Sequence, residues 1–334
     1  MTPRTTIREV AAAAGVSIGT ASRALSGNGS IAPHTRSRVL DAAATLDYQP
    51  NSAARTLRSN RSRTIGLLIP DVRNPYFSEL AHVVEQDALT HGLTTVLCNG
   101  DERSEQMEMY VDVLRSRRVD GVITAPFQDA AASLETLRAD GIPVVFIDRR
   151  IPGSSVPSVT SATANAIDEA VALFAAHGHD RIGCIAGPVT TSTGAERRAQ
   201  VAASAQRHRI DVTWHSGEFR EDVGETGARA FLDAGIRAIL ASDAQATIGA
   251  VRACQQGAVR PGADVHLIGF DDLPVLALAQ PPLTVIRQDI TAMARTAVDL
   301  LLRQRRGESV DPVQLPAQLI VRDSAPRPIE RIPA

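Results

Sequence analysis

A short run near the amino terminus carries side chains suited to reading DNA. Ser17 and Ser22 are small hydroxyls that can bond phosphate oxygens, and Ile18 can touch a thymine methyl group. Arg23 can donate two hydrogen bonds to O6 and N7 of one guanine, which is worth about 1–3 kcal/mol of base discrimination. Taken alone, Arg23 is explained equally well as a solvated surface charge. Whether these residues contact DNA therefore depends on the secondary-structure element that holds them.

The surrounding residues predict two short helices joined by a tight turn at Gly15. Thr6 and Glu9 have the capping-box spacing, which starts a first helix near Ile7. Apolar residues recur at helical spacing along the two helices: Ile7, Val10, Ala11 and Ala14 on the first, Ala21 and Leu25 on the second. This pattern is typical of a helix-turn-helix, which places its second helix in a DNA major groove.

A third helix is predicted over residues 32–46, with Pro33 in its first turn. Its expected buried face consists of Val39, Leu40, Ala43 and Leu46. The segment 51–58 can also form a helix but is too short to be stable alone in water. It carries Leu57 between two arginines.

Charge is divided unevenly along the chain. Residues 1–63 contain nine arginines and three acidic residues, a net charge of +6, within a chain whose total is −2. The remainder therefore has a net charge of −8. A basic amino-terminal segment on an acidic body favours nucleic acid as the partner of that segment.

From residue 64 the pattern changes to alternating strands and helices, after a polar linker at 59–63. The strand candidates are apolar runs at 65–70, 95–99, 121–125, 144–148, 182–187, 238–242, 265–270 and 284–287, with a late strand at 318–322. Helices are predicted near 76–91, 104–118, 130–140, 163–177, 194–209, 223–235, 245–257 and 290–306. Repeated strand–helix units predict an α/β fold of doubly wound parallel sheets, with four or five strands in each of two lobes.

In such sheets ligands bind beyond the carboxyl ends of the strands. Carboxylates and a guanidinium there can hydrogen-bond hydroxyl groups, and aromatic faces can cover apolar ring surface, so a neutral polyhydroxylated ligand fits. The alternatives are structural ion pairs for the charged residues and plain core packing for the aromatic ones. The candidates are Tyr76 and Phe77 after the first strand, Asp148 and Arg149 after the fourth, Arg197 in a later helix, Phe219 after a short strand at 214–217, and Asp271.

Three amino-terminal motifs resemble the lactose/galactose-repressor (LacI/GalR) family of bacterial transcription regulators. They are Val16-Ser17-x-x-Thr20-x-Ser22-Arg23, Tyr48-x-Pro50-Asn51 and Ala54-x-x-Leu57. The resemblance implies that Ile18, Gly19 and Arg23 lie at base-reading positions. It also implies a hinge helix that folds on DNA, where Leu57 from two subunits wedges into a minor-groove step. The implied DNA-binding set is Thr6, Ser17, Ile18, Gly19, Thr20, Ser22, Arg23, Asn51, Ala54 and Leu57.

The resemblance extends over the rest of the chain and implies a core like a periplasmic sugar-binding protein. It implies domains at 1–50 for the helix-turn-helix, 51–63 for the hinge helix and linker, and 64–334 for the effector and dimerisation core. The first lobe is expected at about 64–160 and 290–324 and the second at about 161–289, with crossings near Ser161 and Asp289. All seven cleft candidates above match effector-contact positions of the family.

Other classes of protein find little support in the sequence. There is no P-loop or zinc motif, so we expect neither an enzyme nor a cofactor. His177-Gly178-His179 is interpreted as the end of a helix rather than a metal pair. Cys98, Cys184 and Cys254 lack metal or redox spacing and are expected to be buried free thiols. No apolar run is long enough to span a membrane, and no secretory signal is evident, so a cytoplasmic protein is expected.

These features predict a ligand-responsive transcriptional repressor that binds a pseudo-palindromic DNA operator as a homodimer. A sugar is the favoured effector. A purine- or nucleoside-responsive, corepressed regulator is the first alternative. A solute-binding protein without DNA-binding function is the second, and the basic amino-terminal segment argues against it.

Overall fold

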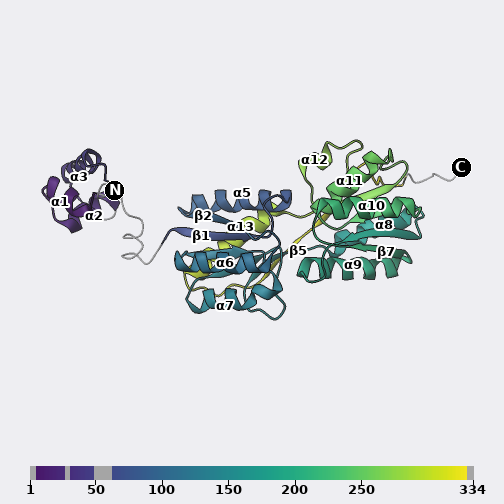
Figure 1. Ribbon diagram of the computed structural model, residues 1–334, viewed down its shortest axis with the longest axis horizontal. Helices are drawn as coiled ribbons and strands as arrows, with labels where there is room; N and C mark the ends of the chain where they lie inside the picture. Colours follow the sequence, from purple (N-terminus) through teal and green to yellow (C-terminus); the bar gives the residue numbers. More distant parts are fainter. Residues whose placement is uncertain (1–4, 27–30, 49–61, 329–334) are drawn as a thin grey trace. The chain divides into compact units, whose positions relative to one another are not determined.

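The computed structural model describes residues 5–26, 31–48 and 62–328 of the 334-residue chain. The chain divides into two compact units, Met1–Ser62 and Arg63–Ala334. We call them the head and the core (Figure 1).

The head is a bundle of helices around a small apolar core. Its described helices are α1 (Ile7–Ala13), α2 (Ile18–Ser26) and α3 (Pro33–Thr45). Gly15 turns the chain between α1 and α2 with a φ of 61°, a conformation that glycine adopts without strain. Arg38 of α3 donates to the carbonyl of Ala14 and so ties the third helix to that turn. The predicted helix-turn-helix is confirmed.

The predicted buried face of α3 is wrong at one residue. Val39 and Ala43 are buried, but Leu40 is 46% exposed. Successive residues on a helix point about 100° apart, so a bundle this small covers Val39 without also covering its neighbour.

The first lobe of the core contains a six-stranded parallel sheet within the described residues, in the order β11-β5-β4-β3-β1-β2. Its strands are β1 (Thr64–Ile69), β2 (Thr94–Asn99), β3 (Gly121–Thr124), β4 (Val144–Ile147), β5 (Ser158–Ala162) and β11 (Val313–Pro316). Its helices are α5 (Pro75–Thr90), α6 (Ser104–Ser116), η1 (Gln128–Ala130), α7 (Ala131–Ala139) and α13 (Ile290–Arg305).

Alternate residues of these strands pack on opposite layers of helices. Leu67 and Ile123 belong to the apolar cluster that includes residues of α5 and α13. Leu68 and Val122, one residue away, belong to the cluster formed with α6 and α7. Figure 1 shows α5 and α6 on opposite sides of β1. Because both faces of the sheet are covered, its central strands are apolar throughout, as the sequence predicts.

The second lobe repeats this arrangement, with the sheet order β12-β10-β9-β8-β6-β7. Its strands are β6 (Arg181–Ala186), β7 (Asp211–Ser216), β8 (Ala238–Ala241), β9 (His266–Phe270), β10 (Thr284–Arg287) and β12 (Gln318–Ile320). Its helices are α8 (Ala164–Ala176), α9 (Ser192–His208), α10 (Glu221–Asp233), α11 (Ala244–Gln256) and α12 (Pro274–Ala277). Only β12 runs antiparallel to its neighbour among the described strands.

The chain passes between the two sheets at three places. The first two passages, after β5 and after β10, lie near the predicted crossings. The third lies at Ala317, between β11 and β12. The assignment of the last part of segment 290–324 to the first lobe is therefore wrong, because β12 pairs with β10 of the second lobe, whereas β11 pairs with β5 of the first. The expectation of four or five strands per lobe is also too low, since β5 and the edge strand β11 are too polar to stand out as apolar runs.

The cysteines and His177 take structural positions in the core. All three cysteines are buried free thiols, as predicted. His177 is the residue that ends α8, but its ring bonds the carbonyl of Pro326 at 2.6 Å rather than the helix's own carbonyls. Among the described residues, no helix has the length and apolar character needed to cross a membrane.

Candidate functional site

The second helix of the head begins with a local network of hydroxyl groups. The backbone N–H of Thr20 donates to Ser17 Oγ at 3.1 Å, and the two side-chain oxygens lie 2.9 Å apart. Thr6, at the start of α1, donates from its backbone N–H and its hydroxyl to the Glu9 carboxylate at 2.6 and 2.9 Å. These three predicted DNA-binding residues therefore also stabilise the helix ends that carry the others.

The outward face of α2 presents the predicted base-reading residues. Ile18 is 44% exposed, although it is apolar, and Gly19 and Arg23 are exposed beside it. Arg23 lies along its own helix, where Nε donates to the Gly19 carbonyl at 3.3 Å. Ser22 is half-buried. The predicted hinge residues Asn51, Ala54 and Leu57 lie outside the described residues.

The cleft of the core gathers all seven side chains that the sequence analysis singles out there. Tyr76 and Phe77 come from α5, Asp148 and Arg149 follow β4, Arg197 comes from α9, and Phe219 and Asp271 follow β7 and β9. Together with their neighbours they surround a cavity of about 20 Å³, room for about one water molecule. A sugar can therefore enter only if the lobes move apart.

Asp148 and Asp271 occupy equivalent places in the two lobes. Each directly follows a strand, and each has a left-handed backbone, with φ of 63° and 64°. Their backbone N–H groups still donate to the neighbouring strand, at 2.9 Å to Val159 O and 2.8 Å to Ile286 O. Left-handed backbone is uncommon outside glycine and concentrates at functional sites. It turns both carboxylates into the cleft.

Arg197 is held rigidly before any ligand contacts it. Its guanidinium carbon lies 4.0 Å from the centre of the Phe270 ring, and Nη1 donates to the Ser242 carbonyl at 2.8 Å. Nη2 lies 4.0 Å from Asp148 Oδ1, across the boundary between the lobes. Stacking and the carbonyl leave part of the guanidinium fork directed at the cleft, where it can donate to ligand oxygens.

Arg149 is buried in an aromatic cage. Its guanidinium makes two hydrogen bonds with Glu102, of 2.8 and 3.1 Å. Its guanidinium carbon also lies 5.1 Å from the ring centres of Phe127 and Phe219. Phe219 in turn needs Gly187 opposite, because a Cβ atom there would lie 2.2 Å from the ring. Arg149 therefore shapes the wall of the cleft more than it offers free donors to it.

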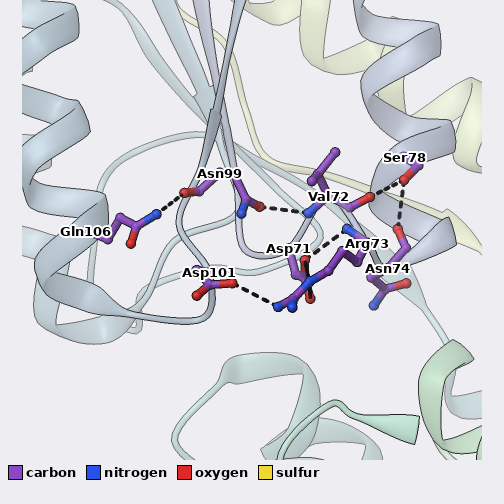
Figure 2. A network of polar contacts seen from close by, with 8 residues as sticks. All are labelled: Asp71, Val72, Arg73, Asn74, Ser78, Asn99, Asp101 and Gln106. Carbon is purple, nitrogen blue, oxygen red and sulfur yellow. Dashed lines mark hydrogen bonds and ion pairs between the residues drawn. The ribbon is translucent and has the colours of Figure 1, made fainter.

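The loop before α5 sets the position of Tyr76 and Phe77. Asp71 accepts from Arg73, whose guanidinium also reaches Asp101 at 2.9 Å, and Asn99 Oδ1 accepts from the N–H of Val72 at 2.7 Å (Figure 2). Asn74 then caps α5, since its side-chain oxygen accepts from the N–H of Tyr76 at 3.0 Å. The two aromatic rings thus enter the cleft from a braced helix start.

Burial changes the titration of the carboxyl groups in the cleft. It raises the pKa of Asp271 to about 7 and that of Asp243 to about 6, although the nearby Arg197 opposes both shifts. Burial also raises the pKa of Asp148, again against Arg197. A cleft that buries three carboxyl groups close together favours their protonated forms. Among the described residues, no cluster of His, Cys, Asp or Glu is suited to hold a metal ion.

The cleft is also lined by five residues that were not among the predicted candidates: Asn74, Thr193, Asp243, Ala244 and Gln288. Gln288 directly follows β10 and Asp243 lies two residues after β8, so the rule that identifies Asp148 and Asp271 also applies to them. Gln288 donates to Asp271 at 2.8 Å, and its side-chain oxygen has no partner. It also borders a larger open hollow of about 1000 Å³ that begins beside α5, α12 and α13.

Two segments of the chain match sequence profiles of known families. Residues 6–51 match the bacterial regulatory proteins of the lacI family, and residues 171–325 match a periplasmic binding protein-like domain. The first match covers α1 to α3 of the head, and the second covers most of the second lobe.

Comparison with whole proteins gives the same result. The ribose operon repressor of Halalkalibacterium halodurans is 33% identical over 324 residues, 96% of this chain and 97% of that protein. The crystal structure of the lac repressor dimer bound to operator and the anti-inducer ONPF aligns with a TM-score of 0.83 and 27% identity, over 97% of this chain and 100% of that one. A complex of the transcriptional regulator CelR with cellobiose aligns with a TM-score of 0.70 and 28% identity, over 96% of this chain and 100% of that one.

Proposed function

Because the chain belongs to the LacI family of bacterial transcriptional regulators, we propose that it represses its target genes as an operator-bound homodimer controlled by a sugar. The family is one of DNA-binding regulators rather than enzymes. Repression of transcription takes place on the chromosome, so the proposed site of action is the cytoplasm.

The proposed DNA-reading group is the outward face of α2. Arg23 supplies a bidentate contact to guanine, Ile18 an apolar contact to a thymine methyl, and Gly19 close approach of the backbone. Ser17, Thr20, Ser22 and Thr6 supply phosphate contacts that fix the register. One such helix reads few base pairs, and two copies on a pseudo-palindromic site double the contacts, which favours a homodimer.

The proposed hinge is the segment that carries Asn51, Ala54 and Leu57. Two apolar leucines can unstack one minor-groove step at a cost of a few kcal/mol, which is offset by the contacts that a kinked duplex makes. Leu57→Ala should therefore weaken operator binding and reduce the bend of the DNA. An unchanged bend angle in the variant would refute the wedge.

The proposed effector is a neutral sugar, and D-ribose is the first compound to test. The observation that carries this proposal is the meeting of Arg197 with the carboxyl groups of Asp148, Asp243 and Asp271 beside aromatic rings. Hydroxyl groups can both donate to carboxylates and accept from a guanidinium, and ring faces cover the C–H surface of a sugar. The relative named above is a ribose operon repressor, and for this reason we choose D-ribose as the first sugar to test.

Sugar and DNA would be coupled through the hinge. In this proposal the hinge forms a stable helix only when two copies meet on DNA, and closure of the lobes would change the separation of the two hinge segments. A coupling free energy of about 1–3 kcal/mol would change operator affinity about 5- to 150-fold.

The experiment begins with the full-length chain and fragmented genomic DNA of its host. Selection should enrich fragments that share a pseudo-palindrome, and a chain lacking residues 1–60 should enrich none. Thermal shift with D-ribose, other sugars, nucleosides and nucleobases should then reveal the effector as the compound that raises Tm. Failure to enrich any sequence would refute the DNA-binding role, and stabilisation by no sugar would refute the effector class.

A purine or nucleoside corepressor remains the second candidate. The observation in its favour is the group of aromatic side chains at the cleft, Tyr76, Phe77 and Phe219, which could stack on a base. Stabilisation by a nucleobase or nucleoside, together with tighter operator binding in its presence, would replace the sugar with this ligand.

A further inference from the structure

Two ion pairs join the lobes among the described residues. One, Arg197 with Asp148, is buried inside the cleft and belongs to the site described above. The other, Arg150 with Glu196, lies at the rim, where the two side chains are 47% and 35% exposed. Every other ion pair between described residues stays within one lobe. The rim pair is therefore placed to sense whether the lobes are together.

The rim pair is well formed. Arg150 Nε donates to Glu196 Oε1 at 2.9 Å, and Nη2 lies 2.7 Å from the same oxygen. The backbone N–H of Arg150 also donates to Ser192 Oγ at 2.9 Å. Arg150 belongs to the first lobe, whereas Ser192 and Glu196 lie in the first turns of α9 in the second. One short segment of each lobe thus makes a side-chain and a backbone contact with the other.

The rim contacts are linked in sequence to the effector residues. Arg150 follows Asp148 and Arg149 directly, and Glu196 immediately precedes Arg197. None of Arg150, Ser192 and Glu196 lines the cavity itself. Closure that brings Arg197 towards Asp148 must therefore bring Glu196 to Arg150 as well, while the rim side chains make no contact with what the cavity holds.

We propose that Arg150, Ser192 and Glu196 form a latch that sets the equilibrium between open and closed lobes, and through it the affinity and exchange rate of the effector. The consequence for the effector rests on the proposed function, whereas the effect on closure does not. Because the closed cavity is too small for a sugar to enter, the latch must release before binding or dissociation. A weaker latch should therefore speed exchange of the effector as well as lower its affinity.

Physical chemistry sets the size of the effect. An exposed ion pair contributes modestly and is screened by salt, so neutralising one partner should lower the closed-to-open ratio about two- to fivefold. Reversing one charge replaces attraction by repulsion and should lower that ratio on the order of tenfold. Exchanging the two charges should restore most of it, because the rim geometry is kept.

The test measures closure in the full chain without effector or DNA. Spin labels at Glu105→Cys on α6 and Ala203→Cys on α9 mark one exposed site in each lobe, on helices that lie on the same side of their sheets (Figure 1). The native cysteines are buried and should stay unlabelled. Pulsed electron–electron double resonance then gives the distance distribution between the labels.

Four forms are compared: wild type, Glu196→Arg, the exchange Arg150→Glu with Glu196→Arg, and Glu221→Arg as control. Arg252 and Glu221 form an ion pair of matching exposure, 47% and 36%, but both belong to the second lobe. We expect Glu196→Arg to shift the distribution to longer distances, the exchange to reverse that shift, and Glu221→Arg to leave it unchanged. A wild-type distribution in Glu196→Arg, or an equal shift in Glu221→Arg, would overturn the latch.

Effector kinetics separate this proposal from the proposed function. With D-ribose as the probe, Glu196→Arg should raise the dissociation rate, while Glu221→Arg should not. If D-ribose fails to bind any form but the distances shift as expected, the latch stands and the assigned effector is wrong. If D-ribose binds and the distances do not shift, the latch is wrong and the effector assignment stands.

Discussion

The head and the core present their functional side chains in opposite ways. The head keeps Ile18 and Arg23 on its surface, and its own apolar interior is formed by little more than three short helices. The core buries Arg197, Asp148 and Asp271 between two lobes and shifts the titration of the carboxyl groups. Substitutions on the α2 face should therefore alter binding without altering folding. Substitutions in the cleft should alter both, because these side chains are buried and interact with one another.

The largest expected effect is that of Arg197→Ala. Arg197→Ala removes the buried guanidinium that donates to the effector and leaves Asp148 without its cation. Effector binding should therefore weaken on the order of 100-fold. Operator binding without effector should change little. Calorimetry with the effector and anisotropy with operator DNA check the two halves.

Arg198→Ala is the matched control for that variant. Arg198 is the next residue of α9 but stacks on Trp214 at 4.1 Å and bonds Ser216 at 3.0 Å, away from the cleft. Equal loss of effector affinity in both variants would show that α9 as a whole, rather than Arg197, supports the site.

The second prediction concerns pH. Burial raises the pKa of Asp271 from 3.8 to about 7, so the folded core binds a proton more tightly than the unfolded chain. Stability from this group is therefore fully present below pH 3.8 and is lost as the pH rises through about 7. Asn cannot titrate, so Asp271→Asn should reduce the loss of unfolding free energy between pH 5 and pH 8, by on the order of 2 kcal/mol.

Urea unfolding of the core at the two pH values measures that difference. Asp112→Asn, on the exposed surface of α6, should lose stability between the two pH values as the wild type does. A pH dependence in Asp271→Asn equal to that of the wild type would contradict the effect of burial on this carboxyl.

A third prediction returns to the head. Arg23→Ala should relax base preference at one position of each half-site about tenfold, without a change in Tm, because the side chain is exposed. Sequencing of a randomised operator library bound by each variant measures the preference. Arg36→Ala, also exposed but on α3, should keep the wild-type preference. Retained selectivity in Arg23→Ala would remove Arg23 from the reading group.

The smallest expected effect separates two neighbours on α3. Val39→Ala should destabilise the head by about 1–2 kcal/mol, because its side chain is buried. Leu40→Gln should change stability by less than about 0.5 kcal/mol, because that side chain faces outward. Thermal unfolding of both variants, followed in the head, measures the difference. Equal losses would mean that the head buries a wider face than its three helices provide.

The contrast between the units also explains what the sequence could and could not predict. In the core, Asp148 and Asp271 could be predicted as site residues because each follows an apolar strand, and the carboxyl ends of parallel strands meet at one edge of a sheet. Asp243 and Gln288 follow from the same rule. Phe127 and Glu102 do not, because they reach Arg149 through loops whose path depends on the packing of the whole lobe.

Strand assignments show the same limit. Central strands such as β3 and β4 are buried along their whole length and appear as apolar runs. The edge strand β11 alternates half-buried and exposed residues and ends at Pro316, so its sequence resembles a loop. Its pairing with β5 adds a third passage between the lobes, which local sequence patterns do not indicate.

The most direct test of the account is operator affinity measured by fluorescence anisotropy with and without effector. We expect the full-length chain to bind its selected pseudo-palindrome as a dimer, and the stabilising sugar to change this affinity about 5- to 150-fold. The direction of the change distinguishes induction from corepression. Equal affinity for the selected site and for bulk competitor DNA, with every candidate metabolite present or absent, would contradict it.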